Sequence, residues 1–231
     1  MKKNRKIPAI ILLLVSFWFS DLLAAKFFPD DLNIPVGMKQ WFVKSISEFL
    51  KSMKEQPLWS EAKDRNRISY RFILKQGWAY KDVVMFRIDQ GTKNNWSLTV
   101  KQTDHFPSKG DFKATRKRLS IKEVKGFQEL FAQLQFWELP SVGAPQHEVL
   151  MFKDYPPIWI LEAVHDRRYQ VIRRIAPKNT SAWGSDPQML KIFKDQGYPD
   201  IDRATSEEIN RKLVAVGEYL VKLSGLKLEL H

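Results

Sequence analysis

Cysteine is absent from the 231-residue chain, which excludes a disulfide framework and any thiolate metal site. The ten glycines are dispersed, and none forms a Gly-x-Gly-x-x-Gly turn or a P-loop. Neither Gly-x-Ser-x-Gly nor His-Glu-x-x-His occurs, and the histidines are scattered at His105, His147, His165 and His231. We therefore expect a domain that is held together by packing alone, without metal or cofactor, and the motifs identify no catalytic residue.

The longest uncharged run, residues 7–20, is too short for a typical membrane span, which needs about 20 apolar residues. Four basic residues within positions 2–6 precede this run, and Asp21 interrupts it. A basic start followed by a short apolar segment and small residues is typical of a secretory signal peptide. We expect residues 1–25 to be such a peptide, cleaved after Ala25, with an uncleaved N-terminal membrane anchor as the alternative. Both interpretations predict an exported domain, periplasmic or otherwise extracytoplasmic.

Basic residues outnumber acidic ones, with 38 Lys and Arg against 26 Asp and Glu. Residues 1–25 hold four of these bases and one of the acids, which leaves a net charge of +9 for the rest. The densest clusters lie within residues 113–125 and 167–178. Such a protein is expected to associate weakly with anionic surfaces. Without a docking fold or stacking aromatics the clusters do not predict nucleic-acid binding, and a solvated face explains them most simply.

Hydrophobic periodicity predicts an α+β fold: an antiparallel sheet built from hairpins and a meander, packed against about four helices. Residues 67–75 alternate in polarity, the pattern of a half-buried strand, and residues 113–119 are expected at an edge because of their charge. The predicted strands are 67–75, 80–88, 96–100, 113–119, 158–165 and 169–175, and the predicted helices are 38–55, 120–134, one around 189–193, and 205–224.

Two helix starts show the spacing of a capping box, in which a Ser or Thr and a Glu three residues later satisfy each other's backbone amides. These pairs are Ser120 with Glu123 and Thr205 with Glu208, and Gly225 is a natural helix end. No repeat or low-complexity linker divides the chain, so residues 26–231 are expected to form one domain. A split into two subdomains near residue 140 is the alternative.

Glu162 interrupts the apolar run of residues 158–164, so a buried carboxylate there needs a charged or donor partner. An even-length turn in the following hairpin places it on the face of Arg173, and an odd-length turn on that of Arg174. A structural ion pair is the simpler interpretation, but a binding or catalytic role uses the same residues. The candidate binding residues are therefore Glu162, Arg173, Arg174, Arg116 and Arg118.

Two further segments, "RKRLSIKEVKGFQELFAQLQFWELP" and "PPIWILEAVHDRRYQVIRRIAP", carry a resemblance that covers roughly residues 113–224. With the closing helix they resemble a family of uncharacterised bacterial exported proteins that has a Leu-Ser-capped helix, Phe-Trp-x-Leu-Pro, and a Trp-x-x-Glu hairpin ending in Arg-x-x-Pro. Members tend to have Asp-Gly before the Trp, where this chain has Tyr155-Pro156-Pro157. The resemblance implies an α+β fold and no established activity.

These observations favour a non-enzymatic binding or interaction protein of the bacterial cell envelope with an unidentified protein partner. One specific version is an immunity protein that blocks a toxin delivered by a neighbouring cell. The alternative is a hydrolase acting on anionic envelope material, with Glu162 or other carboxylates as catalytic groups.

Overall fold

The computed structural model describes residues 27–29, 36–75, 83–103, 112–141, 157–175, 195, 203–228 and 230. The predicted signal peptide or anchor and the predicted helix around residues 189–193 lie outside these residues, as do three of the four histidines. Among the described residues, no helix is both long and apolar enough to cross a membrane.

A six-stranded antiparallel sheet, with strand order β4-β3-β2-β1-β5-β6, forms the centre of the fold. Four strands follow one another as a meander, and a later hairpin joins it because β5 pairs with β1 along seven residue pairs. The predicted α+β fold is confirmed. The strands are β1 (Ser69–Lys75), β2 (Val83–Gln90), β3 (Trp96–Thr103), β4 (Lys113–Leu119), β5 (Ile158–His165) and β6 (Arg168–Ile175).

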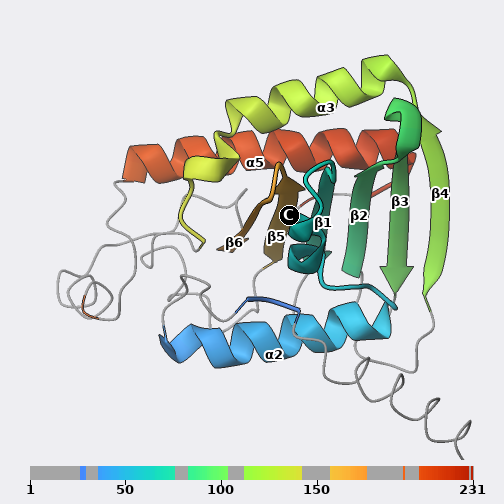
Figure 1. Cartoon of the computed structure of the whole chain (residues 1–231). Helices are drawn as coiled ribbons and strands as arrows, with labels where there is room; N and C mark the ends of the chain where they lie inside the picture. Colours follow the sequence, from blue (N-terminus) through green and yellow to red (C-terminus); the bar gives the residue numbers. More distant parts are fainter. Residues whose placement is uncertain are drawn as a thin grey trace, which may run out of the picture.

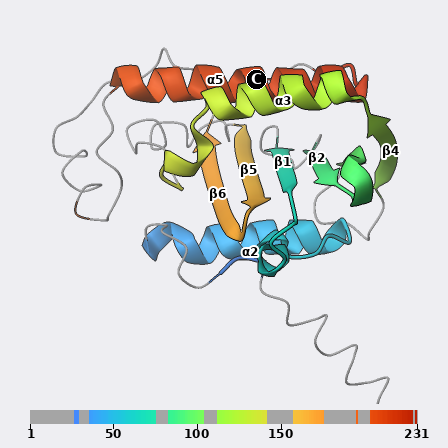
Figure 2. The same cartoon turned by 45° about the horizontal axis from the view of Figure 1, so that its top comes forward.

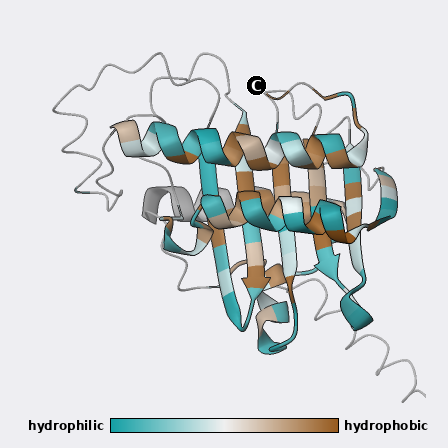
Figure 3. Ribbon diagram, turned by 90° about the horizontal axis from the view of Figure 1, so that it is seen from above, coloured by the Kyte–Doolittle hydropathy of each residue, from teal (hydrophilic) through white to brown (hydrophobic). Residues whose placement is uncertain are grey.

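Helices lie on both sides of this sheet (Figures 1 and 2). One layer holds α3 (Ile121–Gln133) and α5 (Arg203–Ser224), and the opposite layer holds α2 (Val36–Ser52) and the short helix η1 (Leu58–Lys63). The larger hydrophobic core lies under α3 and α5. Figure 3 looks down on that layer and shows hydrophobic residues, in brown, recurring along the strands beneath it. This core contains a group of aromatic side chains that pack ring against ring, including Tyr70, Phe72, Phe127, Phe131 and Trp159.

The capping box predicted at Ser120 is confirmed, since its hydroxyl accepts from the amide of Glu123 and the Glu123 carboxylate accepts from the amide of Ser120. The one predicted at Thr205 is wrong. Helix α5 begins at Arg203, so Thr205 lies inside its first turn rather than before it. Gly225 ends this helix as predicted, with φ of 73°, a conformation that glycine adopts without strain.

The prediction that β1 is half-buried is wrong, because every residue of the strand is buried. Tyr70, Phe72 and Leu74 face α3 and α5, as expected. The alternate residues, among them Arg71, face α2 and η1, where the sequence pattern suggested solvent. A polar strand face can be covered in this way only if its charges find partners.

The two edges of the sheet differ. A segment comprising residues 136–141 runs beside β6: the carbonyl of Ser141 accepts from the Arg173 amide at 2.7 Å, and that of Leu139 accepts from the Gln170 side chain at 2.6 Å. At the other edge, β4 is exposed at six of its seven residues. This confirms the predicted edge strand and leaves an open edge there among the described residues.

Candidate functional site

Eight charged side chains form a cluster between the sheet and the layer of α2 and η1, named here the ion cluster. Its members come from β1, β2, β3, β5 and the chain around η1, and ion pairs connect all of them. Four cations face four carboxylates, so the cluster is neutral as a whole. Its members are Glu55, Glu61, Arg67, Arg71, Arg87, Asp89, Lys101 and Glu162.

Arg71 and Glu162 form the most buried part of the cluster, with side chains 0% exposed. They are directly opposite each other on β1 and β5. The guanidinium binds the carboxylate through two bonds, Nε to Oε2 at 2.6 Å and Nη2 to Oε1 at 2.9 Å. The remaining nitrogen donates to the Gln56 carbonyl at 2.9 Å, and the Tyr169 hydroxyl donates to Glu162 at 2.9 Å. Such a bidentate pair is strong and geometrically specific.

Glu55 connects this pair to the rest of the cluster, since its carboxylate accepts from Lys101 and Arg87 and lies 3.5 Å from the Arg71 guanidinium. Burial raises the pKa of Glu55. The Lys101 hydrogen bond and the positive charges of Arg71, Arg87 and Lys101 outweigh burial and hold that pKa below the ordinary 4.5. The carboxylate is therefore ionised at neutral pH.

Glu61 and Asp89 complete the cluster around two arginines. Arg87 donates to Glu61 at 2.6 Å and to Asp89 at 3.0 Å, and Arg67 binds the same two carboxylates. Burial raises the pKa of Glu61, but the Arg87 charge and the hydrogen bonds from both arginines leave it lowered. Ser69 donates to this end of the cluster.

We expect acid to destabilise the protein through Glu55 and Glu61. Because their folded-state pKa values lie below 4.5, their contribution to stability is present above that pH and is lost as the pH falls through the folded values. The measurement is the urea midpoint between about pH 6 and pH 3, followed by tryptophan fluorescence. A Glu55→Gln/Glu61→Gln variant should show a shallower dependence. Equal slopes for the variant and the wild type would contradict the role assigned to these carboxylates.

The ion cluster is suited to holding α2 and η1 against the sheet rather than to chemistry. All of its charges are compensated, and Glu162 is closed to solvent, so a substrate cannot reach its carboxylate. This arrangement confirms the prediction that Glu162, if buried, has a charged partner. The partner is Arg71, however, which the sequence reasoning assigned to solvent.

The charges at the open sheet edge are arranged differently. Arg116 and Arg118 of β4 are exposed, and their guanidinium groups donate to neutral oxygens, at 3.0 Å to Ser97 Oγ and at 2.6 Å to Asn95 Oδ1. No carboxylate of the described residues forms an ion pair with either. Both line a pocket of about 530 Å³. The β2–β3 turn around Gly91 also forms this pocket, together with Lys117 and with Arg67 and Asp89, which are paired with each other in the ion cluster.

Strand register links this edge to the ion cluster. Arg116 is paired with Thr99, which is paired with Arg87, which is paired with Arg71, the partner of Glu162. One polar row thus crosses five strands on the same face of the sheet. Ion pairs neutralise the charges in the interior of this row, whereas no carboxylate of the described residues neutralises the charge of Arg116 at its end. We name Arg116, Arg118 and the pocket they line the basic edge.

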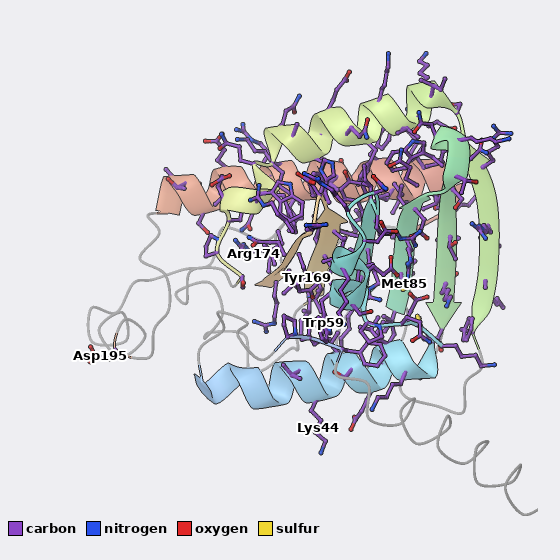
Figure 4. All side chains as sticks on the ribbon, viewed as in Figure 1. Lys44, Trp59, Met85, Tyr169, Arg174 and Asp195 are labelled. Carbon is purple, nitrogen blue, oxygen red and sulfur yellow. The ribbon has the colours of Figure 1, made fainter. Side chains whose placement is uncertain are left out.

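Arg173 and Arg174 lie far from this edge, on β6. Asp166 and Arg167 form a two-residue turn with φ of 48° and 62°, as in a type I′ hairpin, so the even-length alternative applies. Arg173 therefore shares the face of Glu162, where it stands opposite Ile160. Burial, with a further contribution from the Arg173 charge, lowers the pKa of Lys75 to about 8. Arg174 faces the other way and donates to the Pro140 carbonyl at 3.2 Å. Figure 4 labels Arg174 together with Tyr169.

Only some of the polar and aromatic side chains of the β5–β6 hairpin lie beside Glu162. Glu162 and Tyr169 are hydrogen-bonded, whereas Trp159 packs in the opposite core, 5.6 Å from the ring of Phe72, and Pro177 lies outside the described residues. Sequence reasoning identified Glu162 but missed Arg71, Glu55 and the other charged residues of the ion cluster. The available signal was the excess of charged residues beside apolar ones on β1 and β2, together with acids at 55 and 61 just before them.

Among the described residues, no group of three or more His, Asp or Glu could hold a metal ion. No protein-family model and no curated protein sequence matches the chain. Assignments to its residues therefore depend on the geometry given above.

Proposed function

We propose that this chain is an exported, non-enzymatic binding protein of the bacterial cell envelope, and that it holds an anionic partner at the basic edge. The observation that carries this proposal is a contrast of charges on one sheet face. The ion cluster is internally neutral. Arg116 at the end of the same row, and Arg118 two residues further along β4, are exposed, have only neutral hydrogen-bond acceptors among the described residues, and line a pocket. An anionic partner would supply the missing carboxylates or phosphates.

Export is supported by the basic and apolar segment at residues 1–25. A binding role, in preference to hydrolysis, is supported by the burial of Glu162, which was the leading catalytic carboxylate. The immunity-protein version of the proposal adds that the partner is an acidic protein toxin.

Capture from an envelope extract tests this function. The full chain, purified with a tag at its C-terminal end, should retain an anionic partner at low salt. An Arg116→Glu/Arg118→Glu variant should capture at least about tenfold less of that partner. In the native cell, fractionation should place the protein outside the cytoplasm. Recovery in the cytosol with residues 1–25 intact would contradict export.

A matched control keeps the change in net charge but moves it elsewhere. Lys44 and Arg211 are exposed on α2 and α5, the helices that cover the two sheet faces, and Lys44 projects away from the sheet in Figure 4. Lys44→Glu/Arg211→Glu should capture as much partner as the wild type. If both double variants bind alike, binding does not depend on the basic edge and the proposed function is wrong.

A further inference from the structure

We infer that the partner is an acidic polypeptide segment that binds as an additional β-strand along β4, with its carboxylates over Arg116 and Arg118. This inference rests on the proposed function and specifies the class of partner and its mode of binding. The observations behind it are the open edge of the sheet, the spacing of charges along β4, and the position of the pocket.

The open edge supplies the backbone part of this interaction. In an antiparallel pair each strand turns alternate N–H and C=O groups toward its neighbour, so β4, which is paired on one side with β3, directs its other groups outward. Six of its seven residues are exposed. Such an edge is a template for strand addition, in which main-chain hydrogen bonds provide affinity and alternate side chains provide specificity.

The charges on β4 specify what kind of strand fits. Arg116 and Arg118 are two residues apart, so they lie on one face of the strand, and both line the pocket. On the other face the ammonium of Lys117 is already paired with Glu123 at 3.0 Å. An added strand with acidic residues at positions i and i+2 would therefore place both carboxylates opposite the two arginines. Cross-strand pairs of opposite charge are stabilising.

The same charges disfavour a second copy of this chain as the occupant. Four of the seven residues of β4 are basic. Antiparallel pairing of two β4 strands about their common centre would set Arg116 opposite Arg116, and like charges directly opposite are destabilising. Exposed basic residues are also a common device that prevents sheets from joining edge to edge. An added strand with acidic residues would instead place negative charges opposite the basic residues of β4, and such pairs attract each other.

The test uses synthetic peptides of about eight residues, a typical strand length, in which glutamate alternates with valine or threonine. The alternating peptide should bind the full-length protein, and Arg116→Glu/Arg118→Glu should weaken binding at least about tenfold at low salt. A peptide of the same composition with its glutamates consecutive, and one with every backbone nitrogen methylated, should each bind at least about tenfold more weakly. Hydrogen exchange of β4 amides should slow when the alternating peptide is bound.

Each contrary outcome identifies what has failed. If the methylated or consecutive peptide binds as well as the alternating one and β4 amides exchange unchanged, strand addition is wrong and the proposed function stands. If vesicles of phosphatidylglycerol and phosphatidylcholine bind the wild type and the peptides do not, the occupant is a lipid surface. A dimer that the arginine variant abolishes would identify a second copy. If every anionic probe binds Arg116→Glu/Arg118→Glu and Lys44→Glu/Arg211→Glu equally well, the basic edge is not a binding site, and the proposed function is wrong as well.

Discussion

Replacing Glu162 with alanine is expected to lower the free energy of unfolding by about 3–5 kcal/mol, because the buried Arg71 guanidinium would lose its main neutralising carboxylate. Its other carboxylate, on Glu55, lies 3.5 Å away and is shared with two further cations. For a chain of this size the melting temperature should fall by about 10 °C. Urea and thermal unfolding measure the two quantities.

The control for this prediction is Glu208, which forms an ion pair with Lys212 at 2.8 Å on the surface of α5 and whose side chain is 52% exposed. Glu208→Ala should change stability by no more than about 0.5 kcal/mol, since exposed pairs one helical turn apart contribute little. If Glu162→Ala melts at the temperature of the wild type, the buried ion pair is not structural, and a binding role for Glu162 becomes the better interpretation.

Removing both charges of the buried pair is expected to cost less than the sum of the single changes. Arg71→Met alone leaves a buried carboxylate bonded to the Tyr169 hydroxyl, and should cost about 3–5 kcal/mol. Arg71→Met/Glu162→Gln leaves no uncompensated charge at these two positions and keeps an oxygen that can accept from Tyr169. We expect a coupling free energy of at least about 2 kcal/mol from the double-mutant cycle.

The corresponding cycle on Lys212 and Glu208 should give about 0.3–0.5 kcal/mol, because solvent screens that pair. A coupling energy for Arg71 and Glu162 no larger than this would show that the two groups interact no more strongly than surface ions. The ion cluster would then not explain how the polar face of the sheet is kept buried.

The local parts of this fold could be predicted from the sequence. Alternating polarity and the charge of residues 113–119 indicated the meander and its edge strand, and Ser120 marked a helix start, because these signals act between near neighbours in the chain. The Thr205 pair had the same spacing and did not form a cap, since α5 starts two residues earlier. Spacing alone does not determine which turn begins the helix.

The ion cluster could not be predicted in the same way. Arg71 and Glu162 are 91 residues apart and meet only because β5 returns to pair with β1. A strand with polar residues at every second position looks half-exposed, and nothing local to β1 shows that α2 and η1 cover its polar face. Arg116 and Arg118 were identified as candidates by charge density. Only the register of the sheet shows that they have neutral hydrogen-bond acceptors, whereas the buried arginines have carboxylate partners.

Residues 136–141 occupy the β6 side of the sheet with backbone and side-chain bonds, which affects the stoichiometry of any complex formed at β4. A sheet that can be extended from one side only cannot propagate into a filament. Titration should therefore reach an end point at one guest molecule per protein, and the complex should remain a discrete particle at high concentration.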